Sequence, residues 1–361
     1  MAERAAGVLP AQHLRGLHES GAIASAQPLD RDQIQPASLD LRLGARAWRV
    51  RASFLAGRRS VAERLDAFAM HEIDLTRGAA LETGCVYVVE LMERLALPAD
   101  VSGVANAKSS TGRLDLFTRV LTDNGAEFDR VEPGYTGPLY AEISPRTFSV
   151  LARTGARLTQ VRLRRGEPAF TDADHRALHE AAGLVVGEAL IDGGLAFSVD
   201  LSGASQPLGW RAKRHSALID LDRIAHYDPA EFWEPLTRPV AGGIILDPGA
   251  FYILASRESV HVPPDYAAEM APYRAVAGEF RVHYAGFFDP GFGHGPAGGT
   301  GSRAVLEVRC FEAPFALEDG QVVGRLVYEP MLARPDILYG TAIGSTYQAQ
   351  GLRLGKQFRD G

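Results

Sequence analysis

The chain has 361 residues, with 46% hydrophobic and 23% charged residues, as in typical globular proteins. This length exceeds what one ordinary hydrophobic core supports, so we expect two domains. The formal net charge of −6 disfavours a general nucleic-acid binder, which would usually carry a basic face. A small anionic ligand is still compatible, because it needs only a local cluster of donors.

The cysteine content and the N-terminus exclude further classes. The sequence has two cysteines, Cys85 and Cys310, and neither a C-x-x-C nor an H-x-E pair. We therefore expect neither a disulfide framework nor a zinc site. Acidic and polar residues occur before position 20, and no apolar run there is long enough for a signal peptide or a membrane span. The expectation is a soluble cytoplasmic protein with no membrane or nucleic-acid partner.

In chain order, the first predicted element is a short amphipathic helix at residues 13–19, with apolar side chains at helical spacing. The runs 86–91 and 139–143 are rich in β-branched and aromatic residues, which predicts strands. Between them lies the polar segment 108–113, for which we expect a turn or a short helix. The composition of segment 164–168, Arg-Arg-Gly-Glu-Pro, is typical of a connector.

The second half repeats this order, with a helix expected at residues 175–180 and strands at 304–308 and 322–328. The segment Leu81–Val88 recurs as Leu246–Ile253, and other positions recur with the same constant offset in residue number. We therefore predict two tandem copies of one unit. That offset also relates Pro98 to Pro263, Asp100 to Asp265, Glu142 to Glu307, and Gly155 to Gly320.

Each copy is predicted to be mainly β after its short N-terminal helix. Short strands separated by Gly and Pro turns about every eight to twelve residues predict an antiparallel sandwich or barrel. The first copy is expected to span residues 1–170, and the second, with a C-terminal tail, residues 171–361. Upstream of the strands, similarity aligns Ser38–Leu41 with Ser198–Leu201, because Ser-Leu-Asp-Leu nearly matches Ser-Val-Asp-Leu.

The first candidate for chemistry is the segment Lys108–Arg113. It places three hydroxyls between two cations, a set that can donate many hydrogen bonds to anionic oxygens. Arg113 would lie one helical turn after Ser110, on the same face. A solvated polar turn would have much the same sequence. The equivalent segment 273–278 of the second copy lacks serines and the final arginine, and this asymmetry favours a ligand site kept in the first copy.

The second candidate is a Pro-Gly turn that precedes a strand bearing a carboxylate. Such a turn fixes the backbone direction, and the aromatic side chain after it can face a flat ring. Desolvation among apolar neighbours would suit the carboxylate to general acid–base work. The alternative is an edge-strand glutamate that faces water or forms a structural ion pair. The residues concerned are Glu132, Tyr135 and Glu142 in the first copy and Asp289, Phe292 and Glu307 in the second.

Taken together, these motifs resemble the dCTP deaminase branch of the dUTPase-like superfamily, in its tandem, double-length form. The segment at residues 339–356 is polar and contains several glycines. It is either a flap that closes over phosphates or an ordinary frayed tail. The resemblance is carried by Gln35–Gly44, Ser109–Arg113, Val131–Tyr135 and Glu142 in the first copy, and by Asp289–Phe292, Glu307, Tyr347 and Gln350 in the second.

The resemblance implies two distorted β-barrels in a chain that assembles as a homotrimer, with sites between subunits. It implies that Glu142 activates water for attack on C4 of the cytosine of dCTP, while Ser109 and Arg113 position that water and stabilise the developing charge. It implies Mg²⁺ bound through the triphosphate, and no zinc. The nucleotide-binding residues that it implies are Lys108, Ser109, Ser110, Glu132, Tyr135, Asp289, Phe292, Tyr347 and Gln350.

The sequence departs from the family pattern at Lys108, where arginine is usual, and at Glu132, where an aspartate is expected that Asp289 retains. Two arrangements follow. Ser109 and Arg113 act either with Glu142 of the first copy, which we favour, or with Asp289 and Glu307 of the second. Alternative functions are a bifunctional deaminase and dUTP diphosphatase, a dUTPase, or a non-catalytic nucleotide-binding regulator.

Overall fold

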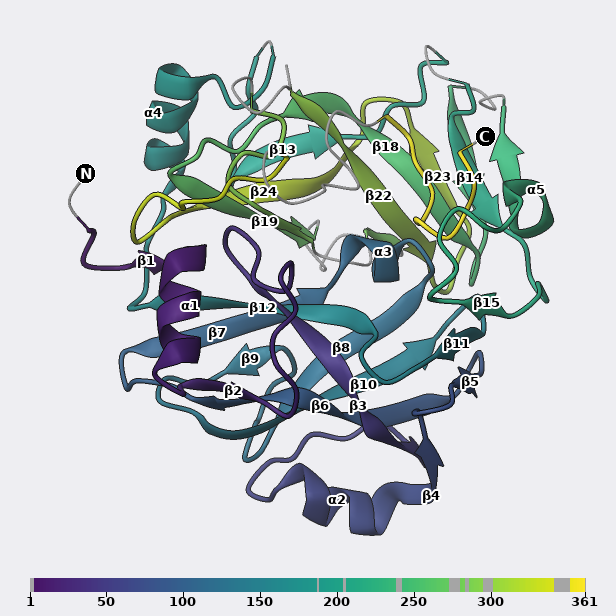
Figure 1. Ribbon diagram of the computed structural model, residues 1–361. Helices are drawn as coiled ribbons and strands as arrows, with labels where there is room; N and C mark the ends of the chain where they lie inside the picture. Colours follow the sequence, from purple (N-terminus) through teal and green to yellow (C-terminus); the bar gives the residue numbers. More distant parts are fainter. Residues whose placement is uncertain are drawn as a thin grey trace. The chain divides into compact units, whose positions relative to one another are not determined.

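The structure is a computed structural model (Figure 1), and it groups the chain into two compact units. No helix among the described residues is long and apolar enough to cross a bilayer. Unit 1 comprises Met1–Pro168, Ala217–His226 and Met331–Asp336, and unit 2 comprises Ala169–Ser216, Tyr227–Pro330 and Ile337–Gly361. The described residues are 3–186, 188–203, 206–237, 242–272, 280–282, 286–294, 301–340 and 351–360.

Unit 1 is built on a ten-stranded antiparallel sheet in the order β8-β10-β6-β3-β12-β7-β9, with β1 paired to β12, β2 to β6 and β4 to β3. The end strands β8 and β9 contact each other, so the sheet curls into a barrel-like form. The strands are β1 Gly7–Val8, β2 Ile23–Ser25, β3 Leu39–Val50, β4 Ala69–Asp74, β6 Val86–Ala96, β7 Val101–Ala107, β8 Leu116–Thr122, β9 Arg130–Val131, β10 Thr136–Pro145 and β12 Arg157–Arg165.

A small three-stranded sheet and three helices complete unit 1. The sheet has the order β15-β11-β5, in which β15 comes from the second half of the sequence and runs parallel to β11. A capping box between Ser60 and Glu63 starts α2, whose buried Val61 and Leu65 pack on a cluster with Val88. The bounds are β5 Ala79–Leu81, β11 Val150–Ala152, β15 Ile219–Asp220, α1 Ala11–Glu19, α2 Val61–Phe68 and α3 Ser109–Gly112.

Unit 2 divides its described strands among three sheets, ordered β13-β24-β19-β21, β16-β14-β18-β22-β20 and β17-β23. A capping box between Thr171 and Asp174 starts α4, and Gly183 in the left-handed region ends it. The bounds are β13 Leu195–Ser198, β14 Gly209–Ala212, β16 Trp233–Leu236, β17 Gly243–Leu246, β18 Phe251–Val260, β19 Tyr266–Pro272, β20 Phe280–Val282, β21 Phe287–Phe288, β22 Ser302–Cys310, β23 Phe315–Glu318, β24 Val322–Pro330, α4 Asp172–Ala182 and α5 Pro229–Phe232.

The strand ladders confirm the internal repeat. Glu142 lies opposite Val88 in unit 1, and their counterparts at the constant offset, Glu307 and Ile253, lie opposite each other in unit 2. A tyrosine contact also recurs, because the Tyr87 hydroxyl accepts the backbone N–H of Glu82 at 3.0 Å and the Tyr252 hydroxyl accepts that of Asp247 at 2.9 Å. The predicted N-terminal helices are present as α1 and α4, and the fold is mainly β as expected.

The ladders correct one part of the alignment. The equivalent pairings β3–β12 and β13–β24 have a bulge at the same place. When the two ladders are superposed by this bulge, Ser198 is equivalent to Arg42 and not to Ser38. The side-chain contacts agree, since the Arg42 N–H donates to Glu93 Oε2 at 2.8 Å and the Ser198 N–H donates to Glu258 Oε2 at 2.7 Å. A match of four residues is too short to fix the alignment of two copies that differ in length in this region.

Candidate active site

The predicted serine segment forms the single-turn helix α3 between β7 and β8. The Lys108 N–H donates to the carbonyl of Leu158 at 3.0 Å, and the Thr111 hydroxyl donates to the same carbonyl at 2.8 Å, so the turn is anchored on β12. Of the predicted ligands, Ser109 is exposed, Ser110 is buried and Arg113 is 3% exposed. The segment therefore exposes the hydroxyl of Ser109 at the surface and buries the hydroxyl of Ser110 and the guanidinium of Arg113.

Lys108 is not an isolated cation. Its Nζ forms an ion pair with Asp40, a buried residue of β3, and Arg157 Nη1 lies 3.6 Å from the other oxygen of the same carboxylate. Asp40 therefore shares its charge between two cations on neighbouring elements. An anionic ligand at Lys108 would therefore compete with Asp40 for the ammonium group.

Glu142 is 2% exposed on β10 and lies directly opposite Arg119 of β8. Arg119 Nη2 donates to Glu142 Oε1, which fixes that oxygen. The second oxygen, Oε2, is buried and has no hydrogen-bond partner among the described residues. A buried carboxylate oxygen without a donor is costly unless a water or a ligand group satisfies it. One oxygen of Glu142 therefore retains the capacity to accept a hydrogen bond from a water or a ligand.

Arg119 is itself held in place by three other side chains. Its Cζ lies 3.4 Å from the ring centroid of Phe128 and 4.8 Å from that of Phe117, and its Nη2 also donates to the Ser53 hydroxyl at 3.0 Å. Arg119 was not among the residues predicted from the sequence. A single arginine among the apolar residues of 116–122 is the signal that could have found it, once that strand is paired with the glutamate strand.

Among the described residues, no hydrogen bond joins Glu142 to the serine segment of the same chain. Glu142 shares a face of β10 with Tyr140, and both Tyr140 and the opposing Val88 belong to the cluster under α2. The side chain of Glu142 therefore faces that cluster, and its described hydrogen bond goes to Arg119 rather than to Arg113.

The Pro-Gly turn of unit 1 is engaged in internal contacts. Glu132 is largely exposed and its carboxylate lies 2.8 Å from Arg130 Nε. The Tyr135 hydroxyl donates to the carbonyl of Pro138 at 2.6 Å and accepts the N–H of Asp123 at 3.1 Å. Burial raises the pKa of Tyr135 to about 12, so the phenol stays protonated as a donor at neutral pH. Tyr135 thus fastens the hairpin in this chain.

The turn residues of unit 2, Asp289 and Phe292, are more deeply buried than their counterparts Glu132 and Tyr135. Asp289 is 8% exposed, and Glu307 on β22 is 4% exposed. The Phe292 ring packs edge-on against Phe288 at a centroid distance of 5.0 Å, and it lies 5.7 Å from the ring of Tyr339. The predicted ligands Tyr347 and Gln350 lie outside the described residues, as does the segment 273–278.

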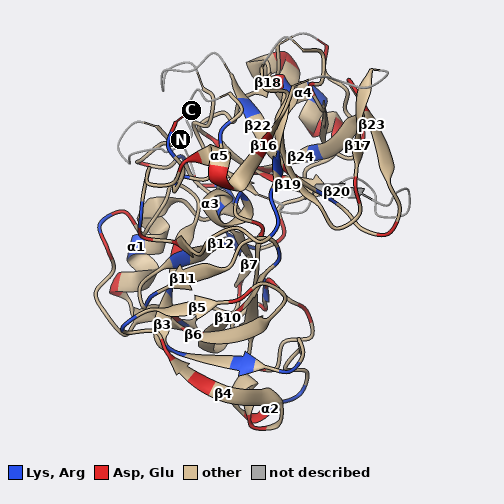
Figure 2. Ribbon diagram, turned by 90° about the vertical axis from the view of Figure 1, so that its right-hand side faces the viewer, with Lys and Arg blue, Asp and Glu red and all other residues tan. Residues whose placement is uncertain are grey.

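The distribution of charge and of metal-binding groups is also informative. Figure 2 shows Lys and Arg residues interspersed with Asp and Glu along the ribbon of unit 1. In the described parts of the chain, no group of three or more His, Cys, Asp or Glu side chains is placed to hold a metal ion. Neither Cys85 nor Cys310 forms a disulfide in this chain. The expectation that no zinc takes part stays a prediction.

Comparison with known proteins assigns the chain to a family. The family described as the N-terminal domain of 2′-deoxycytidine 5′-triphosphate deaminase matches residues 5–167, and the family described as its C-terminal domain matches residues 171–358. The chain belongs to the dCTP deaminase family. The two matches together span most of the chain of this family member, and the second match includes residues 217–226 and 331–336, which belong to unit 1.

Solved and curated relatives of the dCTP deaminase family agree. The crystal structure of 2′-deoxycytidine 5′-triphosphate deaminase from Agrobacterium tumefaciens is 56% identical, with a TM-score of 0.88, and the match covers 92% of this chain and 100% of that chain. The "dCTP deaminase, dUMP-forming" of Beutenbergia cavernae is 31% identical over 147 residues, which are 39% of this chain and 73% of that protein. The protein of the same name from Parafrankia sp. is 34% identical over 160 residues, 42% of this chain and 75% of that protein.

Proposed function

We propose that this family member removes the 4-amino group of dCTP by hydrolysis and releases dUTP and ammonia. The observation that carries this proposal is the buried Oε2 of Glu142, a carboxylate oxygen without a described donor in the unit that also presents Ser109 and Arg113. Family membership and the 56% identity to a dCTP deaminase structure support the same activity. The net reaction consumes one water, which adds at C4 of cytosine, and expels the amine.

Each residue of the site has its own task in this reaction. Glu142 Oε2 accepts a proton from the attacking water and passes it to the pyrimidine ring, while Arg119 keeps the other oxygen fixed. Ser109, Ser110 and Arg113 donate hydrogen bonds to the attacking water, to the developing charge and to nearby phosphate oxygens. Arg119 is a positioning residue in this scheme, because it acts through Glu142.

A complete site needs more than one chain in this proposal. Since Glu142 and the serine segment share no described hydrogen bond within a chain, we place the serine segment of one subunit against Glu142 of a neighbouring subunit, in a homotrimer. The trimer and a cytoplasmic location stay predictions. Sedimentation of the purified protein would test the first of these directly.

The role of Mg²⁺ follows from the donor set. Hydroxyl groups and cations line the serine segment, and these suit phosphate oxygens rather than a divalent metal. We therefore propose that Mg²⁺ arrives bound to the triphosphate, as part of the substrate. Turnover of dCTP should then need Mg²⁺ and should persist when zinc is removed by a selective chelator. A protein that is inactive with Mg²⁺ and becomes active only when zinc is added would contradict the proposed zinc-independent site.

The two candidate carboxylates can be separated by substitution. We expect Glu142→Gln to lower dCTP turnover by about 100-fold or more, and Glu307→Gln to retain most of it. Ammonia release would be measured, with circular dichroism to show that both variants fold. Loss of activity in Glu307→Gln alone would move the catalytic role to unit 2. Tight dCTP binding by the unaltered protein without ammonia release would instead indicate a regulator.

A second activity is favoured by the curated relatives, which are named as dUMP-forming deaminases. Forming dUMP requires a further water to attack the phosphate chain after deamination. Incubation with dCTP, followed by separation of dUTP, dUMP and pyrophosphate, distinguishes the two outcomes. Accumulation of dUTP at the rate of ammonia release supports the simple deaminase. Equal amounts of dUMP and pyrophosphate would show the bifunctional enzyme, and turnover of added dUTP alone would show a dUTPase.

A further inference from the structure

Unit 1 contains a buried ion pair between two neighbouring strands. Glu93 of β6 is fully buried, and Arg42 of β3 covers it. Arg42 Nε donates to Glu93 Oε1 at 2.9 Å, and Gln33 Nε2 donates to the same oxygen at 2.7 Å. The remaining guanidinium nitrogens donate to the Ser25 hydroxyl at 2.7 Å and the Pro28 carbonyl at 2.9 Å. In unit 1 the chain itself thus supplies a guanidinium to this carboxylate.

Unit 2 has the same carboxylate without that guanidinium. Glu258 of β18 is the counterpart of Glu93 at the constant offset of the repeat, at the same place in the repeated strand. The ladder register sets Ser198 at the position of Arg42, and its N–H and hydroxyl each donate to Glu258 at 2.7 Å. The side chain of serine is about four heavy atoms shorter than that of arginine. No described side chain of unit 2 therefore takes the place that the guanidinium of Arg42 has in unit 1.

The second donor of unit 1 is also replaced. The Gln33 carbonyl accepts the N–H of Asp40 at 2.9 Å, and in unit 2 the Leu190 carbonyl accepts the N–H of Ala196 at 2.8 Å. This shared backbone contact sets Leu190 at the position of Gln33. Where unit 1 has a polar amide on its glutamate, unit 2 therefore has an apolar side chain, which is 58% exposed.

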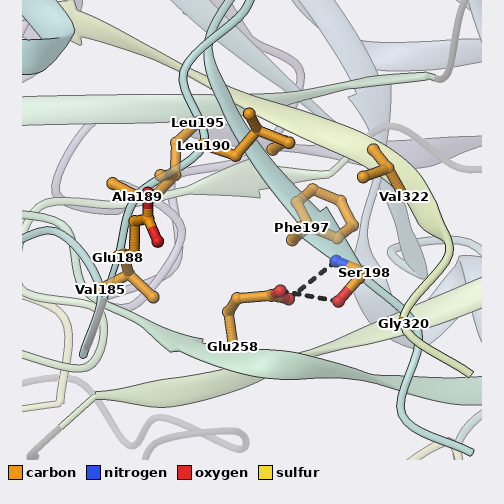
Figure 3. Close-up of a pocket in the computed structure, with 11 residues that line it drawn as sticks. Val185, Glu188, Ala189, Leu190, Leu195, Phe197, Ser198, Glu258, Gly320 and Val322 are labelled. Carbon is orange, nitrogen blue, oxygen red and sulfur yellow. Dashed lines mark hydrogen bonds between the residues drawn. The ribbon is translucent and has the colours of Figure 1, made fainter.

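The position beside Glu258 that corresponds to the Arg42 guanidinium is a pocket (Figure 3). Its volume is about 150 Å³, and Glu258 with its partner Ser198 lies on one side of it. A carboxylate offers about four lone-pair sites, and Ser198 uses two, so Glu258 retains capacity for a further donor. The side chains that give the pocket its character are Glu188, Leu190, Leu195, Phe197, Glu258 and Val322.

We infer that this pocket of unit 2 binds an external guanidinium group carried on a short alkyl chain. The planar guanidinium matches a carboxylate, as Arg42 shows on Glu93 in the same chain. The apolar walls suit the alkyl stem, and Glu188 adds a second negative charge. The volume admits a small ligand or the end of an arginine side chain. This inference does not rest on the proposed function, because it uses no residue of the candidate active site.

The test uses the full-length protein and n-butylguanidinium as the probe. Isothermal titration or ligand-observed NMR should show saturable binding with one site per chain. Glu258→Gln should weaken that binding by about 10-fold or more, because it removes the charge that the guanidinium pairs with. Glu234→Gln is the matched control, since it removes an exposed glutamate of unit 2, and it should leave binding unchanged.

A second variant keeps the inference testable if Glu258→Gln misfolds. Ser198→Arg restores the residue of unit 1, so its own guanidinium should fill the pocket and abolish binding of the probe. Probe binding that persists in Ser198→Arg would place the probe elsewhere and overturn the inference. Equal binding of neutral n-butylurea would also overturn it, since the pocket would then recognise only an apolar chain.

Discussion

Arg119 lies directly opposite Glu142 in the β8–β10 ladder and donates to one oxygen of its carboxylate. Because Glu142 is 2% exposed, removing this cation leaves a charged group buried with no compensating donor. Arg119→Gln should therefore lower the free energy of unfolding by about 2–3 kcal/mol, a figure reduced by the partial exposure of Arg119. Urea denaturation followed by fluorescence would measure the change.

Arg46→Gln is the matched control for this prediction. Arg46 Nε lies 2.9 Å from Glu72 Oε1 in an equally direct ion pair, but both side chains are about half exposed. Solvent-exposed pairs contribute between about 0 and 1 kcal/mol, so this variant should lose little stability. Equal losses in the two variants would show that burial does not set the value of the Arg119 pair.

The ion pair between Arg42 and Glu93 allows a stricter test of buried charge. Arg42→Met should destabilise the protein by about 3 kcal/mol or more, because the carboxyl group of Glu93, which is 0% exposed, loses its guanidinium partner. Adding Glu93→Met should recover at least about 1 kcal/mol of that loss, since the unpaired charge is then gone. The free energies of unfolding of the two single variants and the double variant, from urea denaturation, complete the cycle. A double variant less stable than Arg42→Met would contradict the argument.

Much of this architecture follows from local sequence. The constant offset of the repeat located Glu142 and Glu307 at equivalent places, because strand alternation and Gly-containing turns recur in the same order in both copies. The polar sequence of Lys108–Arg113 predicts a turn or a short helix, and the structure has the short helix α3 there. Features of this kind depend on residues close together in the chain.

Features that depend on strand pairing were missed. The partnership of Arg119 with Glu142 requires knowing which strands are neighbours, and the two residues are 23 positions apart. The alignment of Ser198 with Ser38 failed because the two copies differ in length between this strand and the constant-offset region, which four similar residues cannot reveal. The ladders, whose bulge lies at the same place in both copies, show instead that Ser198 corresponds to Arg42. The pocket beside Glu258 could not be predicted from the sequence either, because it depends on which residue of a paired strand faces Glu258.

Two hydroxyls of the serine segment, those of Ser109 and Thr111, should differ in their roles. Ser109 is exposed, whereas the Thr111 hydroxyl is buried and donates to the Leu158 carbonyl at 2.8 Å. Ser109→Ala should lower kcat/KM for dCTP by about 10-fold or more with little change in stability. Thr111→Val should lower the free energy of unfolding by about 1 kcal/mol, as expected for one lost hydrogen bond. Steady-state kinetics and urea denaturation of both variants would reveal a reversed pattern if these roles are misassigned.

The ion pair between Arg153 and Asp220 should make the stability of unit 1 depend on pH. Arg153 Nη1 lies 2.6 Å from Asp220 Oδ1, and this hydrogen bond lowers the pKa of Asp220 below its ordinary value. A lowered carboxyl pKa stabilises the folded state at pH values above the unfolded pKa of about 3.9. That contribution is lost as the pH falls through the folded pKa.

Asp220→Asn should therefore be less stable than the unaltered protein at pH 7, and the difference should shrink below about pH 4. Urea midpoints at pH 7, 5 and 3 would measure it. Arg153→Met removes the other partner and should show the same convergence, although it also frees Asp222, which lies 2.8 Å from Arg153 Nη1. A difference in urea midpoint between Asp220→Asn and the unaltered protein that stays constant down to pH 3 would contradict this prediction. It would mean that the carboxylate charge of Asp220 does not stabilise the pairing of β11 with β15.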